Sequence, residues 1–181
     1  MYRLGRSSML LRMGLLVTAP LLAHDMWIEP MTFSPQTGEI VGVKLRVGQD
    51  LLGDPLPRNP ALINQFIVED SDGRKPLVGR DGSDPAGFLR VAAPGLLVIG
   101  YNSNPSSVEL TPEKFNQYLK QEGLDTIAAL RASRNETGAK AREMFSRCAK
   151  SLVLSGSPSQ ARGDRLLLGE LLTRSSCSTR P

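Results

Sequence analysis

A chain of 181 residues with a formal charge of +4 is long enough to form one domain with a buried core. The positive charge belongs to the two ends of the chain, since residues 24–155 carry 15 Lys or Arg and 16 Asp or Glu, a balance of −1. Without a basic surface the domain lacks the electrostatic attraction on which nucleic-acid binding depends, so nucleic acid is not an expected partner.

The first 23 residues have the pattern of a secretory signal peptide. Three arginines form a basic start: Arg3, Arg6 and Arg12. An apolar run over residues 13–23 follows and ends in Ala23, which is small enough to precede a cleavage site. This run of eleven residues cannot cross a bilayer, which needs about 20. Its shortness and Pro20 argue against the alternative, an uncleaved anchor. We expect an exported protein that begins at His24 and touches the membrane only before cleavage.

Short extended segments separated by turns fill residues 24–101. In the clearest of them, residues 40–47, valine or leucine at every second position alternates with glycine, lysine and arginine, which predicts a strand with one buried face. Further strands are expected at residues 24–30, 62–69, 74–78, 88–91 and 95–101. The Gly- and Pro-rich stretch 48–59 and the Asp-Gly-rich stretch 79–87 are expected to be loops.

Strands that follow one another about every ten residues, with turn signals between them, are typical of a β-sandwich. We therefore predict a mainly β domain over residues 24–155, a sandwich of the immunoglobulin-like or transthyretin-like type. A helical insert is predicted within it at about residues 111–145, after a polar turn at 102–107 and before a last strand at 146–154.

The insert contains three predicted helical pieces. The first begins well, because Thr111 is suited to cap a helix that starts at Pro112, and Gly123 is suited to end it. The second is expected over residues 125–134, and a last helical turn over 139–145. Apolar stripes are formed by Phe115, Tyr118 and Leu119 in the first helix and by Ile127, Ala128 and Leu130 in the second. Because helices usually bury such stripes, we expect them to pack on the sheet.

The composition changes after residue 155. Residues 156–181 are mostly Ser, Arg, Thr and Pro around one leucine-rich segment, 166–172, which is too short to build a second core. This tail is predicted to be poorly ordered. It contains Cys177, one of two cysteines, and a bridge to Cys148 is feasible in an oxidising compartment. A buried free Cys148 is favoured, since its partner would lie in the tail.

The only histidine, His24, would become the first residue after cleavage at Ala23. Its ring nitrogen Nδ1 and the new α-amine could then chelate one metal ion in a six-membered ring, which suits Cu²⁺ or Ni²⁺. Asp25 and Glu29 are close enough in sequence to add carboxylate oxygens. The hypothesis of a metal site therefore names His24, Asp25 and Glu29. The alternative is an ordinary first strand with a solvated His24.

Two acidic stretches, residues 70–73 and 81–84, resemble parts of calcium loops. Neither is followed by the bidentate glutamate that an EF-hand requires, and Asp-Gly is a common hairpin turn, so turns are predicted at both. No nucleophile elbow, phosphate loop or metalloprotease helix occurs in the sequence. We therefore expect no enzyme activity and no catalytic residues, although a carboxylate pair of a hydrolase would depend on the fold.

Several short motifs together resemble a known family. They are residues 24–30 (HDMWIEP), 47–49 (VGQ), 53–58 (GDPLPR), 84–87 (DPAG), 94–101 (PGLLVIGY), 114–124 (KFNQYLKQEGL) and 146–152 (SRCAKSL). The set covers about residues 24–155 and is similar to the bacterial exported family known as domain of unknown function 4198. The resemblance implies a periplasmic β-sandwich, and some relatives are linked with nickel or cobalt uptake.

The family has no established catalytic residues to carry over, and only His24 matches a family position with ligand chemistry. Family members usually continue into further strands after the last motif, so the C-terminal part is expected to be truncated or frame-shifted here. The resemblance also implies a metal-uptake transporter or another envelope protein as partner.

These observations predict an exported, non-enzymatic binding or accessory protein that handles nickel, cobalt or copper in the periplasm. The alternative is a structural or partner-binding module of the envelope that needs no metal. A third hypothesis is an uncharacterised hydrolase.

Overall fold

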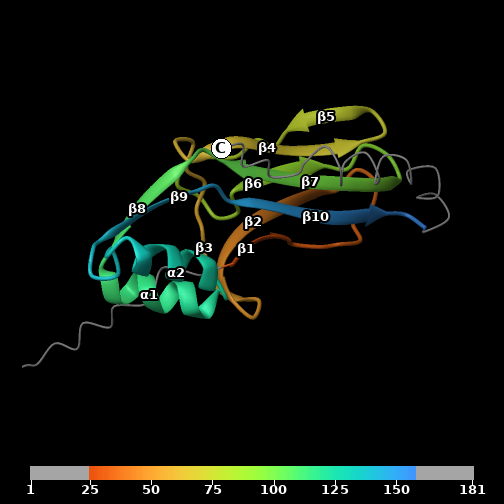
Figure 1. Cartoon of the computed structure of the whole chain (residues 1–181). Coiled ribbons are helices and arrows are strands. Elements are labelled where there is room, and N and C mark those ends of the chain that lie inside the picture. The colour runs from red at the N-terminus through yellow and green to blue at the C-terminus, as the bar shows by residue number, and fades with distance from the viewer. Residues whose placement is uncertain (1–24, 158–181) are drawn as a thin grey trace, which may run out of the picture.

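Residues 25–157 are described by the computed structural model, and in this part of the chain ten strands and two helices form a mainly β fold with antiparallel sheets (Figure 1). At this level the predicted fold class is confirmed. The predicted signal peptide, the proposed ligand His24 and the tail from residue 158 onward lie outside the described residues.

The first sheet is built around β2 (Ile40–Gln49). Its other strands are β1 (Asp25–Pro30), β3 (Leu52–Pro55) and β6 (Gly87–Arg90). β1 pairs with one side of β2, while β3 and β6 share the other side. Val41, Val43 and Leu45 are buried, and Lys44 and Arg46 alternate with them on the opposite face, as the period of two predicts.

The second sheet has the order β10-β7-β4-β5. Its strands are β4 (Ile63–Asp70), β5 (Gly73–Pro76), β7 (Gly95–Ser103) and β10 (Cys148–Ser155). Pro76 lies in the edge strand β5, where its missing N–H removes no bond from the centre of the sheet. Asp70 pairs with Gly73 across the β4–β5 turn, so the acidic stretch 70–73 is a hairpin turn as predicted.

Both sheets contribute to one core. Val43 and Leu45 of the first sheet and Ile99 and Val153 of the second are at most 1% exposed and belong to the same buried cluster. The sheets also meet at an edge, where β1 lies near β10 and the Leu154 N–H donates to the carbonyl oxygen of Phe33 at 2.9 Å. Burial of these apolar side chains supplies the main driving force for folding.

The stretch 48–59, predicted as a loop, contains a strand. β3 pairs with β2 from Arg46 opposite Pro55 to Gln49 opposite Leu52, and the chain reverses at Asp50 and Leu51, whose φ angles are 53° and 59°. The glycine and proline content of this stretch is typical of a loop, but here it serves a tight reversal in which two strands approach closely. Composition alone therefore concealed β3.

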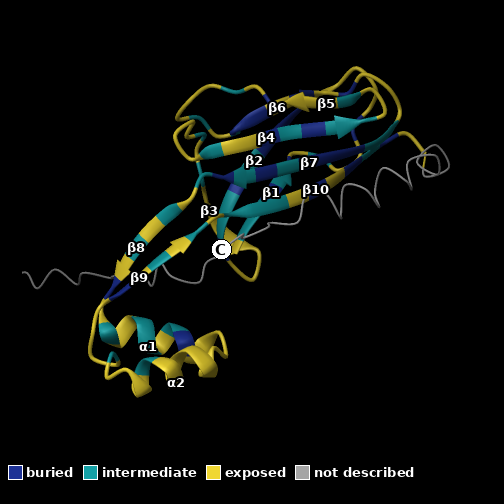
Figure 2. Ribbon diagram, turned by 45° about the horizontal axis from the view of Figure 1, so that its top comes forward, coloured by how far each residue is buried: buried dark blue, intermediate teal, exposed yellow. Residues whose placement is uncertain are grey.

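Residues 106–145 form an arm (Figure 2). β8 (Ser106–Leu110) and β9 (Ala141–Phe145) pair into a two-stranded ribbon that carries α1 (Pro112–Gln121) and α2 (Asp125–Ser133). The predicted start of α1 is confirmed, because the Lys114 N–H donates to Thr111 Oγ1 at 3.5 Å. The predicted helical turn at 139–145 is wrong: pairing with β8 outweighs the helix propensity of these residues. The predicted polar turn at 102–107 shrinks to Asn104 and Pro105.

The prediction that both helices pack on the sheet is also wrong. Figure 2 shows them at the far end of the ribbon, beyond the body formed by the two four-stranded sheets. α2 has no buried residue, and α1 buries only Leu119. A ribbon of five residues in each strand is about 17 Å long, which is enough to hold the helices away from the sheets.

Cys148, the first residue of β10, is disulfide-bonded. The favoured expectation of a free thiol is therefore wrong. Cys177 lies outside the described residues.

Candidate functional site

The structure places two of the three predicted metal ligands on β1. Asp25 is exposed at the start of this strand, and Glu29 lies four positions further on the same face. Four strand residues span about 13 Å, so the two carboxylates do not converge on one ion. Glu29 instead accepts a hydrogen bond from Arg46 Nε at 3.2 Å, and its Oε1 lies 4.0 Å from Lys44 Nζ. Asp25 is the predicted ligand that these cations leave accessible.

Arg46 connects Glu29 to a second carboxylate, since its Nη1 lies 3.7 Å from Asp84 Oδ2. The Arg46 side chain is 14% exposed, less than either acid. A guanidinium that is largely covered and held between two carboxylates has its charge compensated and is poorly placed to attract an anionic ligand. We call Trp27, Glu29, Arg46 and Asp84 the outer-face cluster.

Trp27 fits into this cluster because Gly53 leaves room for its ring, while Gly48 lets the backbone of β3 approach β2 closely. Trp27 pairs with Arg46 across β1 and β2, and Gly48 pairs with Gly53 across β2 and β3. A Cβ atom on Gly53 would lie 2.5 Å from Trp27 Cη2, which is closer than atoms approach. The half-buried indole therefore lies against the backbone of β3, and Gly53 serves its packing.

Three of the sequence motifs meet around this cluster, namely residues 24–30, 53–58 and 84–87. Arg58, at the end of the GDPLPR motif, donates from Nη1 to the carbonyl oxygens of Leu77 at 3.2 Å and Ala86 at 3.1 Å. Ala86 belongs to the DPAG motif, whose Asp84 binds Arg46. Tens of residues separate these motifs in the chain, so spacing could not reveal that they touch. Their contacts hold the loops of the first sheet together.

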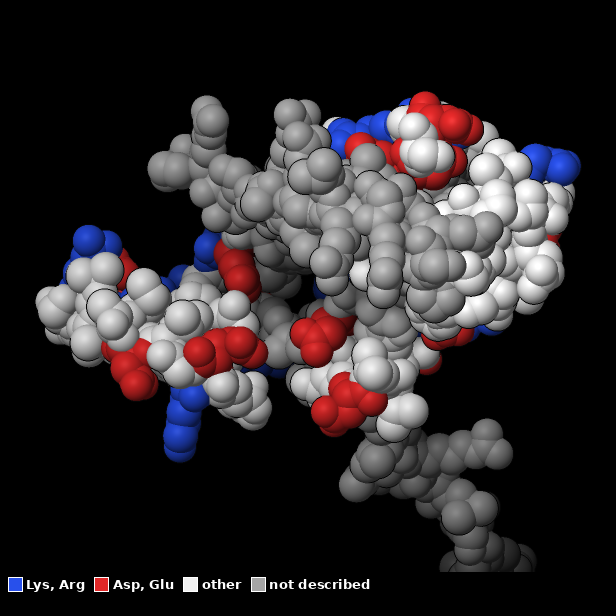
Figure 3. All heavy atoms as spheres, turned by 90° about the vertical axis from the view of Figure 1, so that its right-hand side faces the viewer, with Lys and Arg blue, Asp and Glu red and all other residues white. Residues whose placement is uncertain are grey.

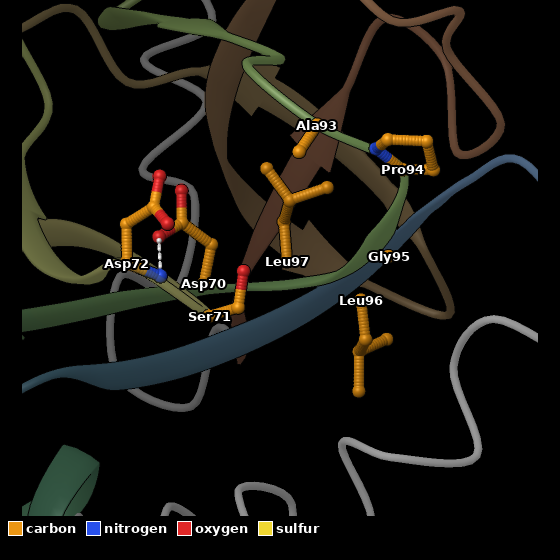
Figure 4. Close-up of a pocket in the computed structure, with 8 residues that line it drawn as sticks. All are labelled: Asp70, Ser71, Asp72, Ala93, Pro94, Gly95, Leu96 and Leu97. Carbon is orange, nitrogen blue, oxygen red and sulfur yellow. Dashed lines mark hydrogen bonds between the residues drawn. The ribbon is translucent and has the colours of Figure 1, made fainter.

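A hollow of about 240 Å³ lies between the β4–β5 turn and the turn before β7 (Figure 4). Its walls are formed by Asp70, Ser71, Asp72, Ala93, Pro94, Gly95, Leu96 and Leu97. Lys75 Nζ lies 3.1 Å from Asp70 and 3.5 Å from Asp72, and the hydrogen bond to Asp70 raises the pKa of Lys75. Both carboxylates thus face a charged amine, and the hollow is smaller than the roughly 300–1,000 Å³ of typical ligand sites.

A second hollow of about 450 Å³ lies beside the segment from Leu56 to Leu62. Its only ionisable lining residues, Arg58 and Asp81, pair with each other at 3.4 Å between Nε and Oδ1. The remaining lining residues are Leu56, Pro57, Asn59, Pro60, Leu62 and Gly82. Glycoside hydrolysis, for example, needs two carboxylates facing one bond, and this hollow offers one carboxylate already bound to an arginine.

The charges on the surface of the described residues do not indicate a particular ligand. Figure 3 shows acidic and basic side chains mixed over the face that it presents. Within residues 25–157, no three His, Cys, Asp or Glu side chains are grouped closely enough to hold a metal ion. The same part of the chain contains no helix that is both long and apolar enough to cross a membrane.

Contacts within the tip of the arm hold it together, but apolar side chains of α2 remain exposed there. Arg131 Nη2 donates to the carbonyl oxygens of Glu136 at 2.6 Å and Ala139 at 2.8 Å, and its guanidinium lies 4.9 Å from the Phe115 ring centre. Ile127 and Leu130 of α2 nevertheless remain 41% and 44% exposed. The alternation in residues 106–110 was the sequence signal that could have revealed the ribbon and hence the position of these helices.

No family model, no curated protein and no solved structure matches this chain. We therefore infer its function from its own residues and their geometry.

Proposed function

We propose that the protein is an exported, non-enzymatic binding module of the periplasm whose arm engages another envelope protein. The observation that carries this proposal is the exposure of α2, a helix at the tip of a projecting ribbon with no buried residue. Helices of globular proteins normally bury an apolar face, and one that stays uncovered is typical of an interaction site.

The chemistry of the arm defines the kind of partner. Residues 106–145 carry six acidic and six basic side chains, so the arm has no net charge. Recognition would then depend on Leu124, Ile127 and Leu130, which are 38%, 41% and 44% exposed. The partner we propose is a protein with an apolar groove that receives α2 in the helix-in-groove manner. Its affinity should change little with salt, because no charge difference steers it.

For the body of the protein we propose the immunoglobulin-like or transthyretin-like sandwich that the strand spacing predicted. In support, the buried cluster draws side chains from both four-stranded sheets. The periplasmic location and the resemblance to the exported family with domain of unknown function 4198 remain predictions from the sequence motifs and form part of this proposal. In this proposal the body is a rigid platform for the arm.

Photo-crosslinking tests the proposed role of the arm. A crosslinking residue at Ile127 should capture one envelope protein in the exporting cells, whereas one at Leu52 on the body should not. With that protein purified, Ile127→Asp should weaken binding at least about tenfold, since it places a charge in an apolar contact. Leu52→Asp is the matched control, because Leu52 is 80% exposed and lies on the body.

Two results would contradict the proposal. One is equal binding of the purified partner by the two aspartate variants. The other is that Ile127 crosslinks only to further copies of the same chain, which would make the arm a self-association element. Thermal unfolding of both variants should match the parent protein, because neither position is buried.

Metal handling is a second candidate function, favoured by the position of Asp25. Its carboxylate is exposed next to His24 and makes no ion pair within residues 25–157, whereas Glu29 is engaged by Arg46. In the processed protein the α-amine and Nδ1 of His24, with Asp25 beside them, would bind Ni²⁺, Cu²⁺ or Co²⁺.

Calorimetry of the processed protein should detect Ni²⁺ or Cu²⁺ binding with micromolar or tighter affinity. His24→Ala should abolish this binding because it removes one arm of the chelate, while Glu29→Gln should leave it unchanged. Mass spectrometry of the mature N-terminus belongs to the same experiment. A start upstream of His24, or equal binding by the parent and His24→Ala proteins, would exclude the chelate.

A further inference from the structure

We propose that Ser103 and Asn104 form a rigid joint, which fixes the direction of the arm relative to the body and so presents α2 to its partner in one orientation. The chain leaves the body along β7 and returns along β10, and the ribbon of β8 and β9 continues these two strands (Figure 2). The direction of the arm is therefore decided where the four strands meet. The fixed direction follows from the contacts of the joint alone, and its benefit for binding rests on the function proposed above.

The joint is a bulge between the two pairs of strands. The Ser103 N–H donates to the carbonyl oxygen of Arg147 at 2.9 Å, which continues the pairing of β7 with β10. The register of the β8–β9 ribbon differs from this pairing by one residue, so Asn104 and Pro105 lie opposite Ser146 alone. Such a two-to-one irregularity bends the strand that carries the extra residue, and here it sets the direction in which the ribbon leaves the sheet.

Pro105 stiffens this bulge. Its ring fixes its own φ angle and, by steric contact, favours an extended conformation of Asn104. Pro105 also has no N–H, so a regular ladder through this position would lack one hydrogen bond. The bulge is therefore favoured over an uninterrupted pairing of the two strands.

Ser103 satisfies the backbone groups that the bulge removes from the ladder. Its hydroxyl oxygen accepts a hydrogen bond from the Arg147 N–H at 2.8 Å, and the hydroxyl donates to the carbonyl oxygen of Asn104 at 2.9 Å. Ser103 is 7% exposed, so water has little access to replace these bonds. Because a buried N–H without a partner is costly, the hydroxyl stabilises this backbone conformation against others.

Asn104 anchors the base of the arm to a neighbouring turn of the body. Its backbone N–H donates to the carbonyl oxygen of Leu62 at 2.8 Å, and its Nδ2 donates to the carbonyl oxygen of Ala61 at 2.9 Å. The turn is itself fixed by Asn59, whose Oδ1 accepts from the Ala61 N–H and whose carbonyl oxygen accepts from the Leu62 N–H. A residue bound at two points resists rotation, whereas a residue bound at one point can turn about it.

Residual dipolar couplings of the backbone amides test the joint, because they report how the arm is oriented and how it moves relative to the body. In the parent protein one alignment tensor should describe both residues 106–145 and the two four-stranded sheets. Asn104→Ala should lower the alignment magnitude of the arm at least about twofold relative to that of the body, because one of the two anchoring bonds is lost. Ser103→Ala should act in the same direction.

Two further variants make this test specific. Asn104→Asp keeps the size of the side chain but places an oxygen instead of a donor against the Ala61 carbonyl, so it should loosen the arm as well. Asn64→Ala is the matched control, since Asn64 is an exposed asparagine of the neighbouring strand β4 whose side chain makes no hydrogen bond within residues 25–157. Three results would overturn the joint: an arm that is already loose in the parent protein, an arm that keeps its alignment in Asn104→Ala, or equal loosening in Asn64→Ala.

Binding measurements separate the joint from the function of the arm. With the purified partner, Asn104→Ala should bind about three- to tenfold more weakly although α2 is intact, because a loose arm must be ordered on docking. Unchanged affinity of a loosened arm would overturn the benefit of the fixed direction. Failure of Ile127 to capture any partner would contradict the proposed function, and the dipolar couplings would still decide whether the joint is rigid.

Discussion

Replacing Leu45 with alanine is expected to lower the free energy of unfolding by about 2–5 kcal/mol. Leu45 lies in β2, the strand that pairs with every other strand of its sheet, and only 1% of the residue is exposed. Alanine would remove the transfer free energy of the side chain and leave a cavity among neighbours that are held by strand pairing on both sides. Such a site has little freedom to collapse.

Urea unfolding followed by circular dichroism would measure this loss. Leu52→Ala serves as the control, because Leu52 is 80% exposed and its substitution should change the free energy of unfolding by less than about 0.5 kcal/mol. Equal losses in the two variants would mean that Leu45 does not lie in the core. The assignment of the inner face of β2 would then be incorrect.

The inner face of β2 is also the feature that the sequence predicts best. Alternation of Val41, Val43 and Leu45 with small or charged residues depends only on the two-residue period of a strand, which tertiary contacts do not alter. The start of α1 was predicted equally well from the sequence, since Thr111 and Pro112 act within one helical turn. These two features are set by neighbours in sequence and were predicted correctly, whereas β3, which is also local, was concealed by its glycine and proline content.

Features that depend on partners far away in the chain were not predicted correctly. Residues 141–145 have helix-forming side chains, and they become β9 only because β8, more than 30 residues earlier, is there to pair with them. The exposure of α2 follows from that ribbon and could not be predicted without it. The disulfide-bonded state of Cys148 likewise could not be predicted from its neighbours in sequence.

The candidate sites also divide into chemistry that one residue carries and arrangements that depend on distant residues. Chemistry that one residue carries, such as the imidazole of His24, could be named from the sequence, and it remains a prediction. The outer-face cluster required the register of three strands and a loop to bring Trp27, Arg46 and Asp84 together. Shared charge and glycine content were the only signals of it in the sequence.

Gly48→Ala is expected to lower the free energy of unfolding by about 1–3 kcal/mol, or more if the β2–β3 reversal opens. A Cβ atom at this position would lie 2.0 Å from the carbonyl oxygen of Leu52 and 2.5 Å from the Cα atom of Gly53. Both obstacles are backbone atoms, which cannot rotate away as a side chain can. Relief therefore requires β3 to move away from β2.

Trp27 makes this movement observable, because it is the only tryptophan in the chain and its ring lies against Gly53. Displacement of β3 should expose the indole and shift its fluorescence emission to longer wavelength in the folded protein. Gly138→Ala is the matched control: a Cβ atom there meets nothing within 4 Å, so neither stability nor emission should change appreciably. Unchanged emission in Gly48→Ala would contradict the close approach of Trp27 to β3.

Measuring metal binding by the Gly48→Ala protein also distinguishes two roles of the motifs around Trp27, packing of the strands and ligand binding. If Gly48 serves the close approach of β2 and β3 and Gly53 the packing of the indole, the Gly48→Ala protein should lose stability while any metal bound through His24 stays bound with unchanged affinity. That outcome is expected, because Arg46 already compensates Glu29 and Asp84 and the cluster offers no open ligand position. A loss of metal binding without a loss of stability would instead make the cluster part of the ligand site.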